Sequence, residues 1–527
     1  MRLSSAIAKS AGLPQDQTVQ QELSVGSLAG RKADGDAPGH VSGLRRSMEI
    51  ITLGWFFGCV WQTATTGSPT TIFLKGLHAS PLHYGIFAAL PFVASLLSLP
   101  ASLLIERTGK RKTIFLSTLY FQRMLWFPIA LVPLWLLTHG SSGAAGAMAV
   151  FLGLMFVMHG VGAAGSPAWV SWMADVVPDR LRGKYFSRRR QWGLASAIPA
   201  AVLIGWLLDH RAITFDPMTT MRWCAIVFMC SAVFGIVDIF LFQYIPDVPK
   251  APQRGSGLLK ALREPLRNRQ FLWFAGFVGT LTFAVGFMQQ FVTLYLLERV
   301  GVGSGGTQAI VLVVPMAAQL LMLPVWGLAV DRMGKKPVLA VAGLGLVPVA
   351  LGWCLLGPSN LWLAFLLGAA HTVLWTGVEI ANFNLMLEMS ASANAADGAA
   401  KGACGGSAYV AVNAVIVNVA GCLGGLVAGV IAQSLKDWSW APVAGMKPFS
   451  YYDALFALSG VLRLAAVVAF LPFIAEPGAR TALEALRFML ATVKGGTVAA
   501  LAQPLARAGR LWAPVRARGG AVKATAK

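Results

Sequence analysis

The chain has 527 residues, of which 56% are apolar and only 12% are charged, about half the charged fraction of an average soluble domain. A soluble chain of this length would split into several domains with charged surfaces, so this composition excludes an ordinary soluble globule and places most of the surface in lipid. The formal net charge of +21 would suit a nucleic-acid partner, but the positions of the basic residues argue against one.

The polar N-terminal segment precedes a long series of apolar segments. Residues 1–48 lack the apolar core of about 7 to 15 residues that a secretory signal needs, so we expect them to form a cytoplasmic tail. A helix that crosses a bilayer needs about 20 mainly apolar residues. We predict twelve such spans, at approximately 49–74, 83–105, 113–137, 147–174, 191–209, 222–244, 271–297, 307–330, 337–357, 361–387, 405–434 and 451–475.

The basic residues predict how these spans are oriented. If the N-terminus is inside, the outer segments hold six of the 43 Lys and Arg residues, two lie within spans, and the others lie on the inner side. Because Lys and Arg accumulate on the cytoplasmic side, we expect a multi-pass protein of the cell (inner) membrane with both termini in the cytoplasm. The positive charge is then explained by topology, and no nucleic acid is expected to bind.

The inner segments also predict the domain organisation. The longest inner loop within the series of spans, residues 245–270, predicts a cytoplasmic linker between an N-terminal six-helix bundle, 49–244, and a C-terminal six-helix bundle, 271–475. The basic tail 476–527 carries Leu483, Leu486 and Leu490 at helical spacing. This pattern suits a helix that lies on the anionic inner leaflet, and a solvated cytoplasmic tail is the alternative.

The loops after the second and eighth spans repeat one pattern. Residues 102–111 read SLLIERTGKR and residues 327–336 read GLAVDRMGKK, so Glu106 and Asp331 are 225 positions apart. Spans one and seven also share Leu, Gly, Gln and Thr at a uniform offset of 228 positions. Internal repeats of this size are typical of secondary transporters.

These loops resemble the signature G-x-x-x-D-R-x-G-R/K-R/K of the major facilitator superfamily. The second copy matches it completely, whereas the first has Ser102 for Gly and Glu106 for Asp. The resemblance covers residues 49–475 and implies an all-α fold of twelve transmembrane helices in two pseudosymmetric six-helix bundles. It also implies a secondary transporter that moves a small organic solute by alternating access, with spans one, four, seven and ten lining a central cavity.

The two loops predict a cytoplasmic latch in each half. An acid beside a short turn can accept backbone N–H groups of a helix N-terminus, and basic residues of the turn can pair with an acid on another helix. The alternative is that these charges only orient the loops. The expected latches are Glu106, Arg107, Gly109 and Arg111 with Asp175, and Asp331, Arg332, Gly334 and Lys336 with Glu388.

Ionisable residues within a span are costly and mark functional candidates. Of Arg123, Asp238, Glu379 and Arg463, only Glu379 lies in a span that lines the cavity in the family's layout. We therefore predict that Glu379 carries a coupling proton or accepts a hydrogen bond from the solute, with a fixed ion pair to Arg463 or Arg123 as the alternative. We expect the other three to form structural pairs.

The further cavity candidates are indoles, amides and imidazoles in spans one, four, seven and ten. Neutral polar groups beside tryptophan suit an uncharged, hydroxyl-rich solute such as a sugar, carried by a monomer and coupled to protons or sodium. A drug/proton antiporter-type exporter is one alternative; a membrane enzyme acting on lipids and a solute sensor that does not transport are the others. These candidates are Trp61, Gln62, His159, Gln289, Gln290, His371, Trp375 and Asn382.

Enzymatic chemistry is not expected. The sequence has no G-x-x-x-x-G-K-[S/T] phosphate loop, so ATP hydrolysis by this chain is not predicted, and no cluster of His, Asp and Glu has metal-ligand spacing. We therefore predict no catalytic residue, no metal and no cofactor. An ion gradient would supply the energy for concentrative transport.

Overall fold

The computed structural model describes residues 38–139, 143–177, 179–211, 217–247, 265–396, 405–441, 448–476 and 478–494. Most of the expected tail 1–48, much of the expected linker 245–270 and the end of the expected tail 476–527 lie outside these described residues. The chain divides into residues 1–46 and residues 47–527. The fold described here is that of the second unit.

The helices of the first half follow its apolar runs. They are α3 (Pro38–Thr65), α4 (Ser68–Gly76), α5 (Pro81–Ser95), α6 (Ser98–Thr108), α7 (Arg111–Met124), α8 (Trp126–His139), α9 (Ala144–Val176), α10 (Asp179–Arg211) and α11 (Pro217–Phe242).

The second half begins with the 3-10 turn η2 (Pro265–Arg267). It continues with α13 (Arg269–Gly286), α14 (Gln289–Tyr295), η3 (Leu296–Val300), α15 (Ser304–Gln308), η4 (Ala309–Val313), α16 (Val314–Met333), α17 (Lys335–Gly352), η5 (Trp353–Leu355), η6 (Pro358–Asn360), α18 (Trp362–Ala396), α19 (Gly405–Ser434), β1 (Ser439–Trp440), β2 (Phe449–Ser450), α20 (Tyr451–Phe470), η7 (Leu471–Phe473) and α21 (Ala482–Lys494).

Several predicted spans are built from two helices. Span 49–74 is divided into α3 and α4 at Gly67, whose φ of 74° lies in the region that glycine adopts most easily. Proline in the first turn of α4 then starts the next helix, where its missing N–H costs no helical hydrogen bond. Span 271–297 is likewise interrupted between α13 and α14, at Phe287 and Met288.

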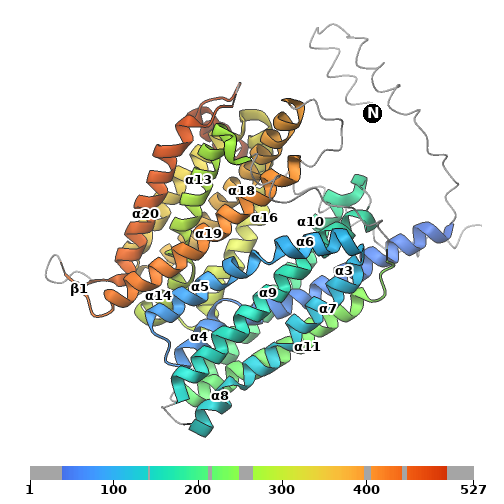
Figure 1. Cartoon of the computed structure of the whole chain (residues 1–527). Coiled ribbons are helices and arrows are strands. Elements are labelled where there is room, and N and C mark those ends of the chain that lie inside the picture. Colours follow the sequence, from blue (N-terminus) through green and yellow to red (C-terminus); the bar gives the residue numbers. More distant parts are fainter. Residues whose placement is uncertain are drawn as a thin grey trace, which may run out of the picture. The chain divides into compact units, whose positions relative to one another are not determined.

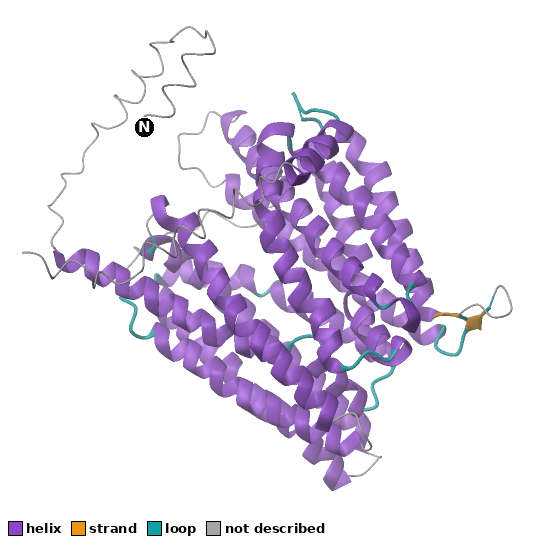
Figure 2. Ribbon diagram, turned by 180° about the vertical axis from the view of Figure 1, so that it is seen from behind, coloured by secondary structure: helices purple, strands orange, loops and turns teal. Residues whose placement is uncertain are grey.

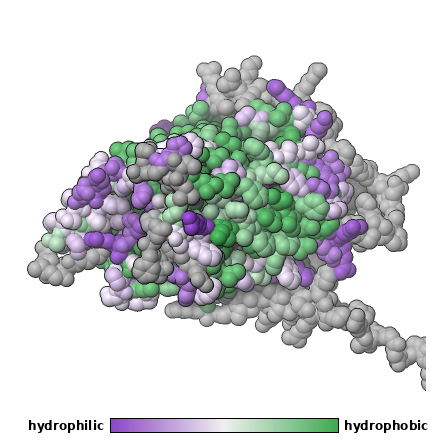
Figure 3. Space-filling view, turned by 90° about the horizontal axis from the view of Figure 1, so that it is seen from below, coloured by the Kyte–Doolittle hydropathy of each residue, from purple (hydrophilic) through white to green (hydrophobic). Residues whose placement is uncertain are grey.

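The described chain is that of a polytopic membrane protein. Eleven of its helical segments are long and apolar enough to cross a bilayer, and the remaining predicted span is the interrupted pair α3 and α4. Figure 2 shows helices almost throughout, apart from the short antiparallel pair of β1 and β2. Large apolar side chains such as Val202 and Leu203 are 63% exposed, and apolar residues cover a broad central area of the surface in Figure 3. The expected all-α fold of twelve helices in two bundles is confirmed.

Two sides of the molecule are distinguished here by their loops. We call the side with Gly67, the residues 301–303 and the β1–β2 pair the hairpin side, and the side with the turns at Gly109 and Gly334 the motif side. In Figure 1, α4 and β1 mark the hairpin side, and α6 and the first turns of α10 mark the motif side.

Among the described residues, the two bundles share an apolar core only towards the hairpin side. One cluster of buried residues there includes Phe73 and Phe151 of the first bundle and Phe291 and Tyr295 of the second. Towards the motif side, the first bundle has its own cluster around Trp172, and the second bundle has its own around Trp326. The described residues therefore pack the bundles together at one end and keep their cores separate at the other.

Glycines bring the bundle helices into close contact. A Cβ at Gly85 of α5 would lie 2.4 Å from the Cα of Gly429 of α19, and one at Gly205 of α10 would lie 2.3 Å from the Cα of Gly305 of α15. Only glycine permits backbones to approach so closely, as in small-residue contacts between membrane helices.

Candidate functional site

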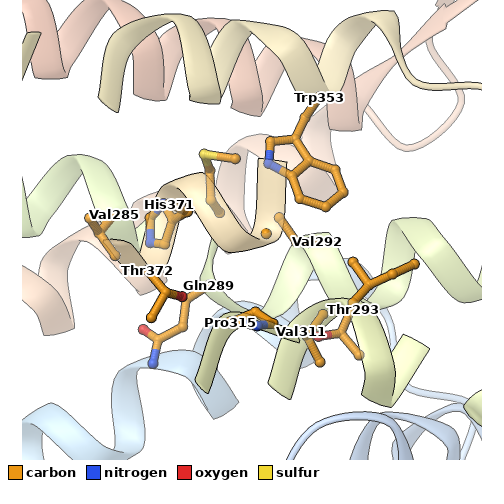
Figure 4. A pocket seen from close by; sticks show the side chains of 12 residues that line it. Val285, Gln289, Val292, Thr293, Val311, Pro315, Trp353, His371 and Thr372 are labelled. Carbon is orange, nitrogen blue, oxygen red and sulfur yellow. The ribbon is translucent and has the colours of Figure 1, made fainter. Parts of the chain in front are cut away.

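A cavity of about 190 Å³ lies within the second bundle. Figure 4 shows His371, Thr372 and Gln289 gathered on one side of it, with the indole of Trp353 on the other. Of the predicted cavity residues, Gln289 and His371 line this cavity. The complete lining is Val285, Met288, Gln289, Val292, Thr293, Ile310, Val311, Pro315, Trp353, Gly368, His371 and Thr372.

Interruptions of regular helix build the walls of this cavity. The break between α13 and α14 puts Met288 before the first residue of α14, which is Gln289. The segment η4 is a π-helical turn that contributes Ile310 and Val311, and such turns occur frequently at functional sites. Hydropathy does not reveal these breaks, because each lies inside an apolar run that is long enough to cross the bilayer.

Three predicted site residues follow one face of α18. The rings of His371 and Trp375 are parallel within 2°, with centroids 6.4 Å apart, and the indole Nε1 of Trp375 donates to Glu379 Oε1 at 2.9 Å. Glu379 itself is exposed, and Asn382 holds a buried amide oxygen that has no hydrogen-bond partner. This face of α18 therefore carries the imidazole of His371, the indole of Trp375 and the carboxylate of Glu379 in succession.

A polar connection between the bundles was missed by the sequence analysis. Arg190 of α10 donates to the side-chain oxygen of Gln319 of α16, and Gln319 Nε2 donates to Thr376 Oγ1 of α18 at 2.7 Å. Arg190 lies one residue before the predicted start of span five, at 191, so it was assigned to a loop. The signal that could have found this group is Gln319, an amide in the middle of the apolar span 307–330.

The predicted residues of spans one and four, together with Gln290, lie elsewhere. The ring of Trp61 lies under the Arg123 guanidinium, with the Cζ atom 3.4 Å from the ring centroid. Gln62 is exposed and His159 is half-buried in α9. Gln290 Nε2 donates to Thr71 Oγ1 at 2.7 Å, which joins α14 to α4. The 190 Å³ cavity belongs to the second bundle alone, so none of these four residues lines it.

Arg123 and Asp238 form a buried ion pair in the first bundle. The distance from Arg123 Nη2 to Asp238 Oδ2 is 3.3 Å, and each side chain is 8% exposed. A Cβ at Gly58 would lie 2.7 Å from the same carboxylate oxygen, so glycine at this position makes room for the pair. These two residues form the structural pair that the sequence analysis expected.

For Arg463 the expectation of a structural pair was wrong. Its Nη1 donates to the backbone oxygen of Leu346 at 3.0 Å, and its Nη2 contacts Met288 Sδ at 3.3 Å. Its Nε is buried without a partner, and no acid lies within ion-pair distance of it in the described chain. Asp238 pairs within the first bundle, and Glu379 contacts Trp375, so neither supplies a partner.

On the motif side of the first bundle, Arg111 contacts Asp175. The distance between Arg111 Nη1 and Asp175 Oδ2 is 2.5 Å, and Arg111 also donates to the backbone oxygen of Ser171 at 2.8 Å. Gly109 takes a φ of 67° in the turn before it. Glu106 and Arg107 are exposed. A role of this contact in transport remains a prediction.

In the second bundle, the predicted pairing of Lys336 with Glu388 was wrong. Lys335 Nζ lies 2.7 Å from Glu388 Oε2, whereas Lys336 Nζ donates to the backbone oxygen of Pro472 at 3.1 Å. The reason is helical geometry: α17 begins at Lys335, so successive side chains point about 100° apart around its axis.

The acid that caps α17 also differs from the prediction. The carboxylate of Glu476 accepts the backbone N–H groups of Lys335 and Lys336 at 3.0 and 2.7 Å, which places a negative charge at a helix N-terminus. Asp331, which was expected to act in the latch, is exposed, and the Arg332 guanidinium lies 5.8 Å from the ring centroid of Phe488.

Comparison with known proteins decides the family. The sequence profile of the Major Facilitator Superfamily matches residues 50–409. The chain belongs to this superfamily. Among curated relatives, it is 24% identical over 307 residues to the ectoine/proline transporter ProP of Corynebacterium glutamicum, which covers 53% of this chain and 57% of that protein. It is 31% identical over 104 residues to the multi-drug resistance efflux pump PmrA of Streptococcus pneumoniae, covering 19% of this chain and 25% of the pump.

Solved structures of the superfamily share the fold. The nucleoside transporter NupG aligns with a TM-score of 0.57 at 12% identity, covering 82% of this chain and 100% of NupG. A bacterial homologue of the lysosomal transporter Spinster, solved in an inward-facing and occupied conformation, aligns with a TM-score of 0.55 at 14% identity, covering 87% of this chain and 98% of that one. The chain spans 57% and 25% of the curated relatives' lengths. The family profile shows the superfamily, and the solved structures show the fold.

Proposed function

We propose that this protein moves a small polar organic solute across the cell (inner) membrane by alternating access, as a monomer with the motif side in the cytoplasm. Membership of the superfamily and the membrane-spanning fold support the transporter class. Phe73 and Phe291 belong to one apolar core on the hairpin side, whereas Trp172 and Trp326 belong to separate cores on the motif side. This division of the core carries the proposal, because it is the arrangement expected of a carrier open to the cytoplasm.

Three polar contacts between the bundles on the hairpin side agree with this conformation, and the contact of Arg190 with Gln319 joins the bundles further towards the motif side. Gln290 binds Thr71, the hydroxyls of Ser68 and Ser304 are 2.7 Å apart, and Lys75 lies 3.5 Å from Glu298. All three contacts join the first bundle to the second on the hairpin side. An alternating-access cycle would break them while bringing the motif-side loops together.

The cavity limits the size of the solute. Its volume of about 190 Å³ is smaller than the roughly 300–1,000 Å³ of pockets for drug-sized ligands, which suits a small solute. Gln289, Thr293, His371 and Thr372 provide hydrogen-bonding groups beside the Trp353 indole, which suits a hydroxyl-rich or amide-bearing solute. The named substrates of a relative, ectoine and proline, and of a structural neighbour, nucleosides, are polar small molecules too.

Two observations support the exporter alternative. The chain matches part of the multi-drug resistance efflux pump PmrA, and Glu379 is exposed on α18, where it could balance a positive charge on a solute. A cavity wall with four neutral polar side chains favours the polar solute.

Transport by purified protein in proteoliposomes tests the proposal. The panel comprises sugars, sugar acids, amino acids, nucleosides and lipophilic cations, each assayed with and without a proton gradient. We expect uptake of a polar solute that Gln289→Ala reduces and that the matched cavity variant Val292→Ala retains. Uptake of lipophilic cations alone would favour the exporter, and binding of a polar solute without flux would favour a sensor.

A further inference from the structure

We propose that the cavity of the second bundle binds its solute through a carboxylate, which the guanidinium of Arg463 attracts. This inference rests on the proposed transport function and narrows the class of solute. It starts from the contrast between two buried charges in corresponding helices. Asp238 lies in α11, the sixth span, and Arg463 lies in α20, the twelfth span, 225 positions later.

Each of these residues faces the third span of its own bundle. Asp238 meets Arg123 of α7, so the first bundle holds one negative and one positive charge. Arg463 meets the backbone oxygen of Leu346 in α17, which carries no formal charge. Arg463 therefore lacks the opposite charge that Arg123 has in Asp238.

Arg463 is completely buried, with 0% of its surface exposed. A buried charge is normally paired with an opposite charge, since removing it from water is costly. Its Nε has no partner, and its contact with a thioether sulfur is a weak hydrogen bond. The guanidinium thus has unused capacity for an anionic acceptor.

The described acids of the second bundle are engaged or placed elsewhere. Glu298 contacts Lys75 and the hydroxyl of Tyr452, Asp453 accepts from Ser450 at the start of α20, and Glu379 accepts from Trp375. Glu388 and Glu476 pair with Lys335 on the motif side. An external anion is therefore the natural counter-charge for Arg463.

Met288 connects the guanidinium to the cavity. It lines the cavity, and its sulfur contacts Arg463 Nη2 at 3.3 Å. Methionine is unbranched and readily changes rotamer, so a solute carboxylate can replace the sulfur as the acceptor of Nη2. The guanidinium fork suits a carboxylate because it can donate two parallel hydrogen bonds.

The rest of the wall defines the other end of the solute. Gln289, Thr372 and His371 offer neutral hydrogen-bonding groups. A small hydroxy acid, sugar acid or amino acid combines a carboxylate with such polar groups and fits the cavity volume. A lipophilic cation would meet the uncompensated charge of Arg463 and be repelled.

Binding and counterflow with matched pairs of solutes test the inference. The pairs are glycerate with glycerol, gluconate with sorbitol, and proline with prolinamide, so that each acid is compared with a neutral or cationic counterpart. We expect the wild-type protein to prefer at least one acid, and we expect Arg463→Gln to lower the affinity for that acid by about tenfold or more, the range for a hydrogen bond to a charged group. Arg463→Lys should keep part of the preference because it keeps the charge.

Ser459→Ala is the matched control. Ser459 lies one turn before Arg463 in α20, is fully buried and donates to the backbone oxygen of Ala284 at 2.6 Å. The Ser459→Ala variant should leave the ratio of acid affinity to neutral affinity unchanged. If Ser459→Ala and Arg463→Gln lowered the acid affinity equally, the effect would come from helix packing and the inference would be overturned.

Binding of the matched solutes to the wild-type protein tests the carboxylate site even if Arg463→Gln does not fold. Equal binding of acids and their counterparts, or flux of the neutral members alone, would overturn the carboxylate site while leaving transport intact. Acid binding without flux of any solute would instead overturn the proposed transport function while supporting the site.

Discussion

The carboxylate of Asp209, near the end of α10, accepts the backbone N–H group of Ser304, the first residue of α15. It also accepts the N–H of Gly305 at 2.9 Å. An acid at a helix N-terminus is stabilised by the unpaired N–H groups and the helix dipole. Because α10 belongs to the first bundle and α15 to the second, this contact holds the bundles together on the hairpin side.

Asp209→Asn should weaken closure of the hairpin side. Removing the charge should weaken the contact by about 1 kcal/mol. This corresponds to about a fivefold shift of the conformational equilibrium towards the state open on the hairpin side. The measurement is the rate of thiol alkylation at Ser68→Cys, a position that is 0% exposed in the present structure, above the background of the native cysteines.

Asp437→Asn provides the control for this experiment. Asp437 has an 89% exposed side chain beside Lys436 on the same side of the molecule, so its loss should not change alkylation. Equal alkylation rates in Asp209→Asn and the parent protein would show that the contact does not hold the bundles closed.

Gly334→Ala should destabilise the second motif loop. Gly334 has φ of 100° and ψ of 166°, a backbone region that is essentially restricted to glycine and costs about 1–3 kcal/mol for other residues. A Cβ there would also lie 3.3 Å from both carboxylate oxygens of Glu476. We expect a lower midpoint of thermal unfolding in detergent.

Gly327→Ala is the matched variant, because Gly327 belongs to the same motif but lies within α16, where a Cβ would meet nothing within 4 Å. Alanine is the better helix former by about 1 kcal/mol, so this change should be neutral or stabilising. The same loss of stability in both variants would contradict the backbone argument.

The positions of the spans could be predicted because a bilayer imposes about 20 apolar residues on each crossing. The breaks at Gly67 and Met288 lie inside apolar runs that are long enough for one crossing, so the length criterion does not detect them, although Gly67 and Pro69 are residues that can end and start a helix. The location of the cavity depends on the second break. Sequence reasoning therefore found Gln289 and His371 as lining residues but also assigned Trp61 and Gln62 to the same cavity.

Pairings between helices needed three dimensions. Either Lys335 or Lys336 satisfies the motif in sequence, and the start of α17 decides that Lys335 reaches Glu388. Arg190 and Gln319 are 129 positions apart, so only the approach of α10 to α16 reveals their contact. The helix suggested by Leu483, Leu486 and Leu490 is present as α21 and leaves these leucines exposed; its attachment to the inner leaflet remains a prediction.

Asp238→Asn should destabilise the first bundle by about 3 kcal/mol, because it leaves the Arg123 charge buried without a counter-charge. Trp61 and Gln122 still contact the guanidinium, which keeps the cost at the lower end of the usual range. Unfolding in detergent measures the loss. The double variant Arg123→Gln with Asp238→Asn should recover part of it, since no charge then remains buried, and a double variant that is less stable by the full sum of two single losses would contradict the ion-pair argument.

Glu379→Gln should separate solute movement from its driving force. The sequence analysis predicts that Glu379 carries a coupling proton. A glutamine at this position still fits beside Trp375 but cannot bind and release a proton. We expect accumulation driven by a proton gradient to fall to the level of passive equilibration, whereas exchange of labelled for unlabelled solute across the vesicle membrane continues. Proteoliposomes loaded with solute measure both rates on one preparation.

Asp437→Asn is the control for an acid outside the spans. Asp437 follows α19 and has an 89% exposed side chain, so its loss should leave proton-driven accumulation intact. Accumulation that survives in Glu379→Gln would exclude this residue as the proton carrier, and loss of both accumulation and exchange would indicate that Glu379 binds the solute. If Glu379→Gln alone lost accumulation and kept exchange, the exposed carboxylate of Glu379 would be the group that binds the coupling proton.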